Sequence, residues 1–255
     1  MIRMMKFAAT LVLMLGVAGC PRAEQPAIVT YSIMPVEKGT VLFDLQPDDL
    51  DENGELEFWI HPNAAGKLTC EADVSTVVIA GADPGIERVN RAVRDLAEQA
   101  RCTHDQDISY FIPKVTYISA DAVSISMEIT DYGRGANGSC HTRNKYLNFD
   151  LASGRQYRLP DILRSDAFPR IRQDILAHFR KDSEIPLDLL TDLLDRDFWA
   201  MGVFIKDHKL YVDMGNYLKS CVDGPFFPVE IDPSYIDQTR PPYWLNEALG
   251  MARRK

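Results

Sequence analysis

The clearest pattern in the chain is an alternation of apolar and polar residues between 122 and 132. Its apolar positions are two residues apart: Val123, Ile125, Met127 and Ile129. Alternate side chains of a strand point to opposite faces, so the pattern predicts a half-buried antiparallel strand. Residues 107–118 predict its partner strand, which Pro113 interrupts or places at a sheet edge.

The remaining elements fall into groups rather than alternating along the chain. Shorter strands are predicted at 40–45, 55–61, 74–80, 145–151, 155–159, 199–205, 209–214 and 226–231. Helices are predicted from Asp83-Pro84 to about Ala100, over 160–196 and around 243–253, where apolar residues recur at helical spacing. This grouping predicts an α+β fold with antiparallel sheets and helices packed on one side.

The first residues have the layout of a secretory signal, with two basic residues and an apolar run over 7–17 that is too short to span a bilayer. Val17-Ala18-Gly19-Cys20 resembles the lipobox of bacterial lipoproteins, whose cysteine is acylated and becomes the N-terminus. We expect a signal peptide at 1–19 and a lipid anchor on Cys20; an ordinary cleaved signal is the alternative. Pro21 stands where an aspartate would indicate inner-membrane retention, which favours the outer membrane, facing the periplasm.

Three parts are expected after the signal. They are a lipidated tether at 20–38, an N-terminal α+β part at 39–118 and a C-terminal α+β part at 119–255. The full chain has a formal net charge of −9, and removing the two basic residues of the signal makes it −11. An acidic body argues against nucleic-acid binding and suits a basic partner, or simply solubility.

Four further cysteines, an even number in an oxidising compartment, predict two disulfides. They are Cys70, Cys102, Cys140 and Cys221. Three pairings are possible, and we favour Cys70–Cys102 with Cys140–Cys221 because each pair then lies within one half of the chain. Zinc binding is the alternative, but the sequence has no Cys-x-x-Cys spacing, so no metal site is predicted.

Residues 131–141, DYGRGANGSCH, predict a bent connection between strands, since glycines and the Asn-Gly pair adopt positive φ readily. A disulfide could simply shape this loop, or hold it rigid for a partner. Catalysis by Cys140 with His141 is disfavoured because neighbouring residues of an extended chain point apart. Asp131 and Asp150 flank the loop and could be glycosidase carboxylates, but we favour their interpretation as surface or turn aspartates. No catalytic residue and no cofactor is predicted.

A series of short motifs runs from 121 to 232. In order, they are Tyr132, Gly135-Ala136-Asn137-Gly138, Tyr146–Leu151, Ser153-Gly154-Arg155, Leu159, Asp161-Ile162-Leu163, Lys209–Val212, Tyr217, Gly224-Pro225 and Val229–Ile231. Together they resemble the extracytoplasmic domain of the lysozyme-sensing anti-sigma factor family, which also accompanies some peptidoglycan deacetylases. The resemblance is weaker over 75–118 and does not extend to 21–70.

Two departures limit what the resemblance implies. Asn137 replaces the family's loop histidine, and Arg134 replaces one of its paired glycines. The sequence shows neither the transmembrane segment nor the sigma-binding segment of that family, so the anti-sigma activity is not carried over. The deacetylase activity belongs to a different domain and is not carried over either.

The expectation is a non-catalytic binding protein of the cell envelope that recognises, or inhibits, a lysozyme-like muramidase. The residues expected to contact the partner lie on two loops: Tyr132, Arg134, Asn137, His141 and Tyr217. Alternatives are a module that binds peptidoglycan, a structural lipoprotein without a discrete ligand, and an enzyme that acts on peptidoglycan.

Overall fold

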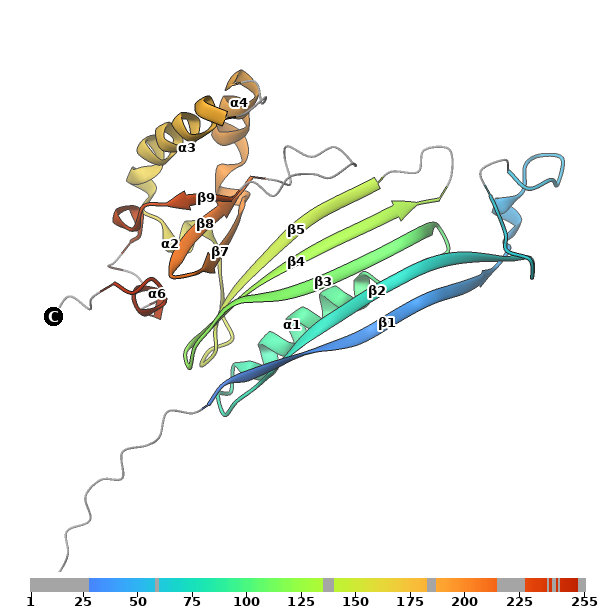
Figure 1. Cartoon of the computed structure of the whole chain (residues 1–255), viewed down its shortest axis with the longest axis horizontal. Helices are drawn as coiled ribbons and strands as arrows, with labels where there is room; N and C mark the ends of the chain where they lie inside the picture. The colour runs from blue at the N-terminus through green and yellow to red at the C-terminus, as the bar shows by residue number, and fades with distance from the viewer. Residues whose placement is uncertain are drawn as a thin grey trace, which may run out of the picture.

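The structure is a computed structural model, and two sheets with their helices make up the fold (Figure 1). It describes residues 28–57, 60–134, 140–182, 187–214, 228–237, 239, 242 and 244–251; the side chains of 140, 141, 181, 182 and 189 are not described. The predicted α+β class is confirmed, with a six-stranded sheet and a three-stranded sheet.

The large sheet holds its strands in chain order. They are β1 (Thr30–Asp44), β2 (Lys67–Ala80), β3 (Gln106–Ile118), β4 (Ala122–Gly133), β5 (Cys140–Asp150) and β6 (Gln156–Tyr157). All neighbours are antiparallel except β2 and β3, which run parallel. A parallel pair needs a crossover connection, and α1 (Ile86–Gln99) supplies it. The sequence pattern did not predict this parallel pair.

Helix α1 covers one face of the large sheet and creates the first core. Its buried side chains recur at helical spacing and pack against apolar residues of the strands: Ile86, Val89, Val93 and Ala97. The helix begins at Ile86, later than predicted, with Gly85 at its N-cap. A Cβ on Gly85 would overlap the backbone of Leu151 and Gly154, so glycine is needed where the helix meets the turn after β5.

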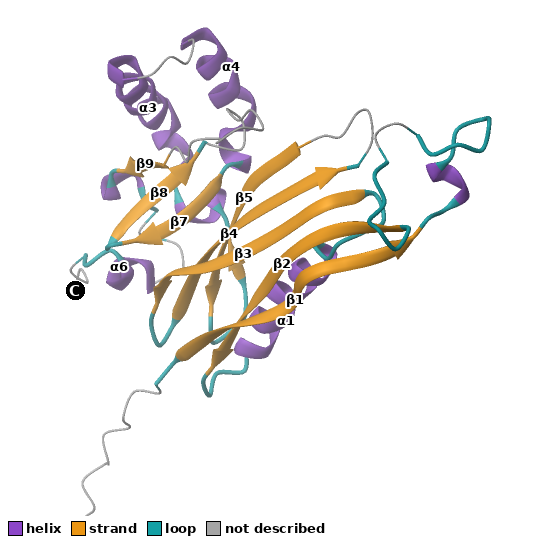
Figure 2. Cartoon of the chain, turned by 45° about the vertical axis from the view of Figure 1, so that its right-hand side comes forward, coloured by secondary structure: helices purple, strands orange, loops and turns teal. Residues whose placement is uncertain are grey.

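A second unit follows the large sheet. It consists of α2 (Leu159–Ile162), α3 (Phe168–Asp182), α4 (Leu187–Asp197), β7 (Gly202–Lys206), β8 (Lys209–Asp213), β9 (Pro228–Ile231) and α6 (Trp244–Ala248), with short 3-10 turns at Ser165–Ala167, Phe198–Ala200 and Pro233–Tyr235. The antiparallel sheet β7–β8–β9 and these helices enclose a second core. Figure 2 shows this small sheet against β5, apart from α1.

The two units are joined through the face of the large sheet that α1 leaves uncovered. The Ser124 hydroxyl accepts a 3.1 Å hydrogen bond from the Ile205 N–H, and the Asn148 amide donates one of 2.7 Å to the Val203 carbonyl. Both polar side chains are fully buried or nearly so. Because each bonds to the backbone of β7, they fix the register of the small sheet on the large one.

Three expectations about the organisation of the chain were wrong. Residues 30–38, assigned to the tether, form the first part of β1. The predicted boundary at 118/119 falls in the β3–β4 hairpin. It therefore cuts through one sheet and does not separate two structural parts. Among the described residues of 55–61, only an isolated bridge between Leu56 and Leu50 is strand-like, near the 3-10 turn Pro47–Asp49.

The Cys70–Cys102 disulfide is confirmed, and it ties β2 to the segment between α1 and β3 with a Cα–Cα distance of 6.1 Å. The second predicted disulfide involves Cys221 and the side chain of Cys140, which lie outside the described residues. Cys20 and residues 1–19, the predicted signal segment, also lie outside them. Within the described part of the chain, no helix is long and apolar enough to cross a membrane.

Candidate functional site

The predicted partner-binding residues divide into those that the structure places and those that it does not. Tyr132 and Arg134 are described at the end of β4, whereas Asn137, Tyr217 and the side chain of His141 lie outside the described residues. The backbone of His141 pairs with Asp131 of β4. Only the start and end of the predicted loop 131–141 can therefore be placed.

Arg134 does not project towards a partner. Its side chain is only 6% exposed, and its guanidinium donates to Asp107 at 2.9 Å and to the carbonyls of Thr69 and Gln106 at 2.6 and 2.8 Å. These contacts tie the end of β4 to β2 and β3. The expectation that Arg134 is presented to a partner is thus wrong, because its donors are needed to hold the sheet together at this end.

Tyr132 lies on a surface that we call the open face. It consists of two rows of residues in register across the large sheet: Lys38, Asp73, Tyr110, Thr130 and Thr142 in one, and Thr40, Glu71, Ile108 and Tyr132 in the other. The open face is on the side of the sheet opposite α1, at the end that the small sheet does not cover. Its side chains are exposed or half-buried, and Tyr132 is 37% exposed.

A shallow hollow of about 330 Å³ lies on the open face. It is lined by Lys38, Gly39, Glu71, Ala72, Asp73, Tyr110 and Ile112. Two carboxylates and one ammonium line it: Lys38 and Asp73 are 3.9 Å apart, and Glu71 accepts a 2.7 Å hydrogen bond from Thr40. Ile112, in register with Glu128 beside the two rows, is 47% exposed. The surface therefore combines acidic groups with exposed apolar side chains.

Two strands that flank the predicted binding loops, β5 and β8, are joined by side-chain hydrogen bonds. Asn144 of β5 donates a 3.2 Å hydrogen bond to the carboxylate of Asp213, the last residue of β8, and Tyr146 donates one of 2.6 Å to it. Asp213 is 1% exposed, and burial together with its charge raises the pKa of Tyr146. The strand that receives loop 131–141 and the strand that precedes Tyr217 are thus joined by a buried network beside the open face.

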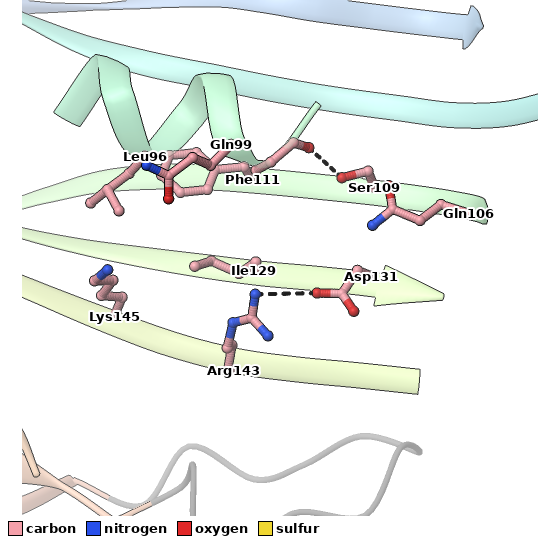
Figure 3. Close-up of a pocket in the computed structure, with 10 residues that line it drawn as sticks. Leu96, Gln99, Gln106, Ser109, Phe111, Ile129, Asp131, Arg143 and Lys145 are labelled. Carbon is pink, nitrogen blue, oxygen red and sulfur yellow. Dashed lines mark hydrogen bonds and ion pairs between the residues drawn. The ribbon is translucent and has the colours of Figure 1, made fainter. Parts of the chain in front are cut away.

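A second hollow, of about 160 Å³, lies on the other face of the large sheet, beside the C-terminal end of α1 (Figure 3). We call it the cationic hollow. Its lining consists of Leu96, Gln99, Ala100, Gln106, Ser109, Phe111, Ile129, Asp131, Arg143 and Lys145. The sequence pattern did not indicate it, because the strand was predicted to begin at 145, which left Arg143 outside any predicted element.

The carboxylates weighed as a glycosidase pair are far apart. Asp131 pairs with His141, and Asp150 lies nine residues further along β5, which is roughly 30 Å at the rise of a strand. Glycosidase carboxylates must lie about 5 to 10 Å apart. Asp150 instead accepts hydrogen bonds from Ser153 in the following turn. This pair cannot act together on one glycosidic bond.

A histidine cluster lies near the tip of the β1–β2 hairpin. The two ring nitrogens of His104 are 3.1 Å from Asp49 and 3.2 Å from Asp105. Burial lowers the pKa of His104, but the hydrogen bonds and charges of Asp105 and Asp49 outweigh it and raise the pKa. Asp49 also accepts a hydrogen bond from the Gln46 N–H, so the cluster holds the irregular segment after β1 in place. Across the described ranges, no group of three potential ligands could hold a metal ion.

Comparisons with known proteins give structural neighbours of this fold. Neither a protein-family model nor a curated protein sequence matches the chain. A DUF3298 family protein from Pseudomonas aeruginosa PAO1 is similar in structure, with 14% identity, a TM-score of 0.48 and coverage of 84% of this chain and 96% of that one. A DUF3298 family member from Bacteroides fragilis has 13% identity, a TM-score of 0.47 and coverage of 87% and 93%.

Proposed function

We propose that the chain is a lipid-anchored, non-catalytic binding protein of the cell envelope whose partner is a basic, lysozyme-like muramidase. The observation that carries this proposal is the open face, where acidic and apolar side chains lie beside the anchors of both predicted loops. The sequence resemblance to a lysozyme-sensing domain supplies the identity of the partner. Cys20 holds the anchor, and the expected location is the periplasmic side of the outer membrane.

Charge supports this choice of partner. The chain carries −9 overall, and Glu71 and Asp73 face solvent on the open face beside a single lysine. Complementary charge mainly raises the rate of encounter, whereas apolar contacts at the centre of an interface supply most of the affinity. Tyr132 and Ile112 are the exposed apolar groups that we expect at that centre.

The buried Asn144–Asp213–Tyr146 network explains how the loops would act together. A rigid base reduces the entropy that two loops lose when they bind a partner. The predicted Cys140–Cys221 disulfide would add a covalent link between segments whose ends the network already joins. In this proposal the loops cover the hydrolase cleft while the open face contacts its rim.

The experiment compares two charge reversals with the same net change. Asp73→Lys lies on the open face, whereas Asp95→Lys lies on the exposed side of α1, on the other side of the sheet. We expect Asp73→Lys to slow association with a c-type lysozyme about tenfold at low salt, while Asp95→Lys changes it little. Equal effects of the two reversals would remove the open face from the proposed interface.

A peptidoglycan-binding module is the second candidate, because the hollow on the open face is lined in part by Tyr110 and a polar rim. Binding of purified, enzyme-free peptidoglycan by the chain, lost in Tyr110→Ala, would favour it over the muramidase. A structural lipoprotein would show neither interaction.

A further inference from the structure

We propose that the cationic hollow is a binding site for a carboxylate on a short aliphatic chain. The hollow lies on the α1 side of the large sheet, opposite the open face, so the inference is independent of the muramidase proposal. Three charged groups line it: Asp131, Arg143 and Lys145. With the formal charges taken together it carries +1, in a chain that is strongly acidic.

The guanidinium of Arg143 has N–H donors available for a ligand. Its one ion pair with a described residue is to Asp131, at 3.4 Å, which is longer than a direct hydrogen bond. The arginine side chain is 55% exposed, and Figure 3 shows it reaching along the sheet towards Asp131. A guanidinium carries five N–H donors in a planar fork, so it can bind a carboxylate while it keeps the contact with Asp131.

The ammonium of Lys145 is influenced by two neighbouring cations, although the residue as a whole is exposed. Burial, Arg143 and Arg158, in that order, lower the pKa of Lys145. Within the described part of the chain, no carboxylate or hydrogen-bond acceptor pairs with this ammonium. An anion bound between Lys145 and Arg143 would relieve the repulsion between the two cations.

The polar wall of the hollow offers a further donor. The amide oxygen of Gln106 accepts a hydrogen bond from the Thr103 N–H at 3.0 Å, which leaves its NH₂ group available for a ligand oxygen. The hydroxyl of Ser109 is committed to the Ala100 carbonyl and is 2% exposed. Gln106 is therefore the neutral side chain that we expect to assist the two cations.

Size and charge select the ligand class. The hollow, about 160 Å³, is below the range of about 300 to 1,000 Å³ typical of sites for drug-sized molecules. Its floor is apolar, formed by Phe111 and Ile129, with Leu96 of α1 above. A monoanion neutralises the net charge of +1, whereas a phosphate dianion would be repelled by Asp131. A carboxylate attached to a few carbons, as at the C-terminus of a peptide, fits the small volume, the apolar floor and the net charge of the hollow.

The test uses N-acetyl-alanine as the probe and its amide, which lacks the negative charge, as the control ligand. Binding of the full chain is followed at low salt by saturation-transfer NMR on the probe's methyl groups. We expect N-acetyl-alanine to bind in the millimolar range and its amide to bind at least tenfold more weakly. Inorganic phosphate, followed by its displacement of N-acetyl-alanine, should also bind at least tenfold more weakly. A tripeptide with a free C-terminal alanine then separates a free small acid from a peptide end: equal or tighter binding assigns the peptide end, and weaker binding assigns the free acid.

Two variants make the assignment specific. Arg143→Gln and Lys145→Gln should each weaken N-acetyl-alanine at least fivefold, while Lys114→Gln, an exposed lysine on the other side of β3, should leave it unchanged. Absence of binding to the wild-type chain, equal binding by Arg143→Gln, or tighter binding of phosphate would overturn the proposal. Circular dichroism confirms that each variant is folded before it is compared.

Discussion

The hydroxyl of Tyr146 in the large sheet donates a 2.6 Å hydrogen bond to the carboxylate of Asp213 in the small sheet. Both groups are buried, so neither can exchange this bond for one to water. The ring of Tyr146 stacks on Phe204, which in turn stacks on Tyr211, with centroids 5.0 and 5.2 Å apart. This contact joins the two cores through β5, which follows the predicted loop 131–141, and β8, which precedes the segment that contains Tyr217.

Removing the hydroxyl with Tyr146→Phe should lower the free energy of unfolding by about 1 to 3 kcal/mol, because a buried carboxylate loses a donor. Tyr211→Phe is the matched control, since Tyr211 stacks in the same column with its ring half-buried. Tyr211→Phe should lower the free energy of unfolding by less than about 0.5 kcal/mol. Chemical denaturation measures both, and equal costs would contradict the account of the junction.

Gly202 should tolerate no side chain, because a Cβ there would overlap the ring of Tyr146. Overpacking of this kind typically costs about 1 to 3 kcal/mol, and Gly202→Ala should reach the upper part of that range. Gly81→Ala is the control, since its added Cβ would meet the ends of two side chains, Ile86 and Val29, and not a ring or the backbone. If Gly202→Ala is no worse than the control in thermal unfolding, the sheets do not pack as described.

The Cys70–Cys102 disulfide closes a loop with a sequence separation of 32 that contains α1. Replacing both cysteines with alanine should destabilise the chain by roughly 3 to 4 kcal/mol, mainly because the unfolded chain gains conformational freedom. Reduction of the wild-type protein should reproduce much of this loss. A loss below about 1 kcal/mol in both measurements would show that the bridge does not restrain the unfolded chain.

His104 should make stability depend on pH. Its pKa in the folded state is raised, so the protonated form is favoured by folding. The contribution is fully present below the unfolded pKa, about 6.5, and is lost as the pH rises through the raised folded pKa. The free energy of unfolding, measured between pH 5 and 8, should fall across this window in the wild type and less in His104→Gln. The exposed His61→Gln variant should behave like the wild type; if His104→Gln does so too, the cluster is not the cause.

The periodicity of the sequence was sufficient to predict those strands and helices whose two faces differ in polarity. Val123 to Ile129 predicted β4 correctly because one face packs under α1 and the other carries polar groups. The parallel pairing of β2 with β3 was missed because it depends on how α1 crosses the sheet, which no local pattern encodes. Residues 30–38 were misjudged because β1 is an exposed edge strand, with Tyr31 and Ile33 about half exposed, so its pattern resembles a tether.

The candidate site was predictable only in part. The packing of the two sheets brings Asn144 to Asp213, which is far away in the sequence. No residue spacing in the sequence predicts such a contact. Arg134 was taken for a surface residue because it stands between two glycines of a loop, yet backbone carbonyls of β2 and β3 bind its guanidinium. The cationic hollow likewise depends on register, since Arg143 and Lys145 become neighbours on one face only once β5 is known to start before them.

The most direct measurement is a calorimetric titration of the chain, with its disulfides formed, into c-type lysozyme and the muramidases of the same cell, with wall lysis followed in parallel. We predict saturable binding near one-to-one and loss of lysis at the same ratio for at least one of these enzymes, weakened by Tyr132→Ala. Absence of binding and of inhibition for all of them would contradict the proposed function.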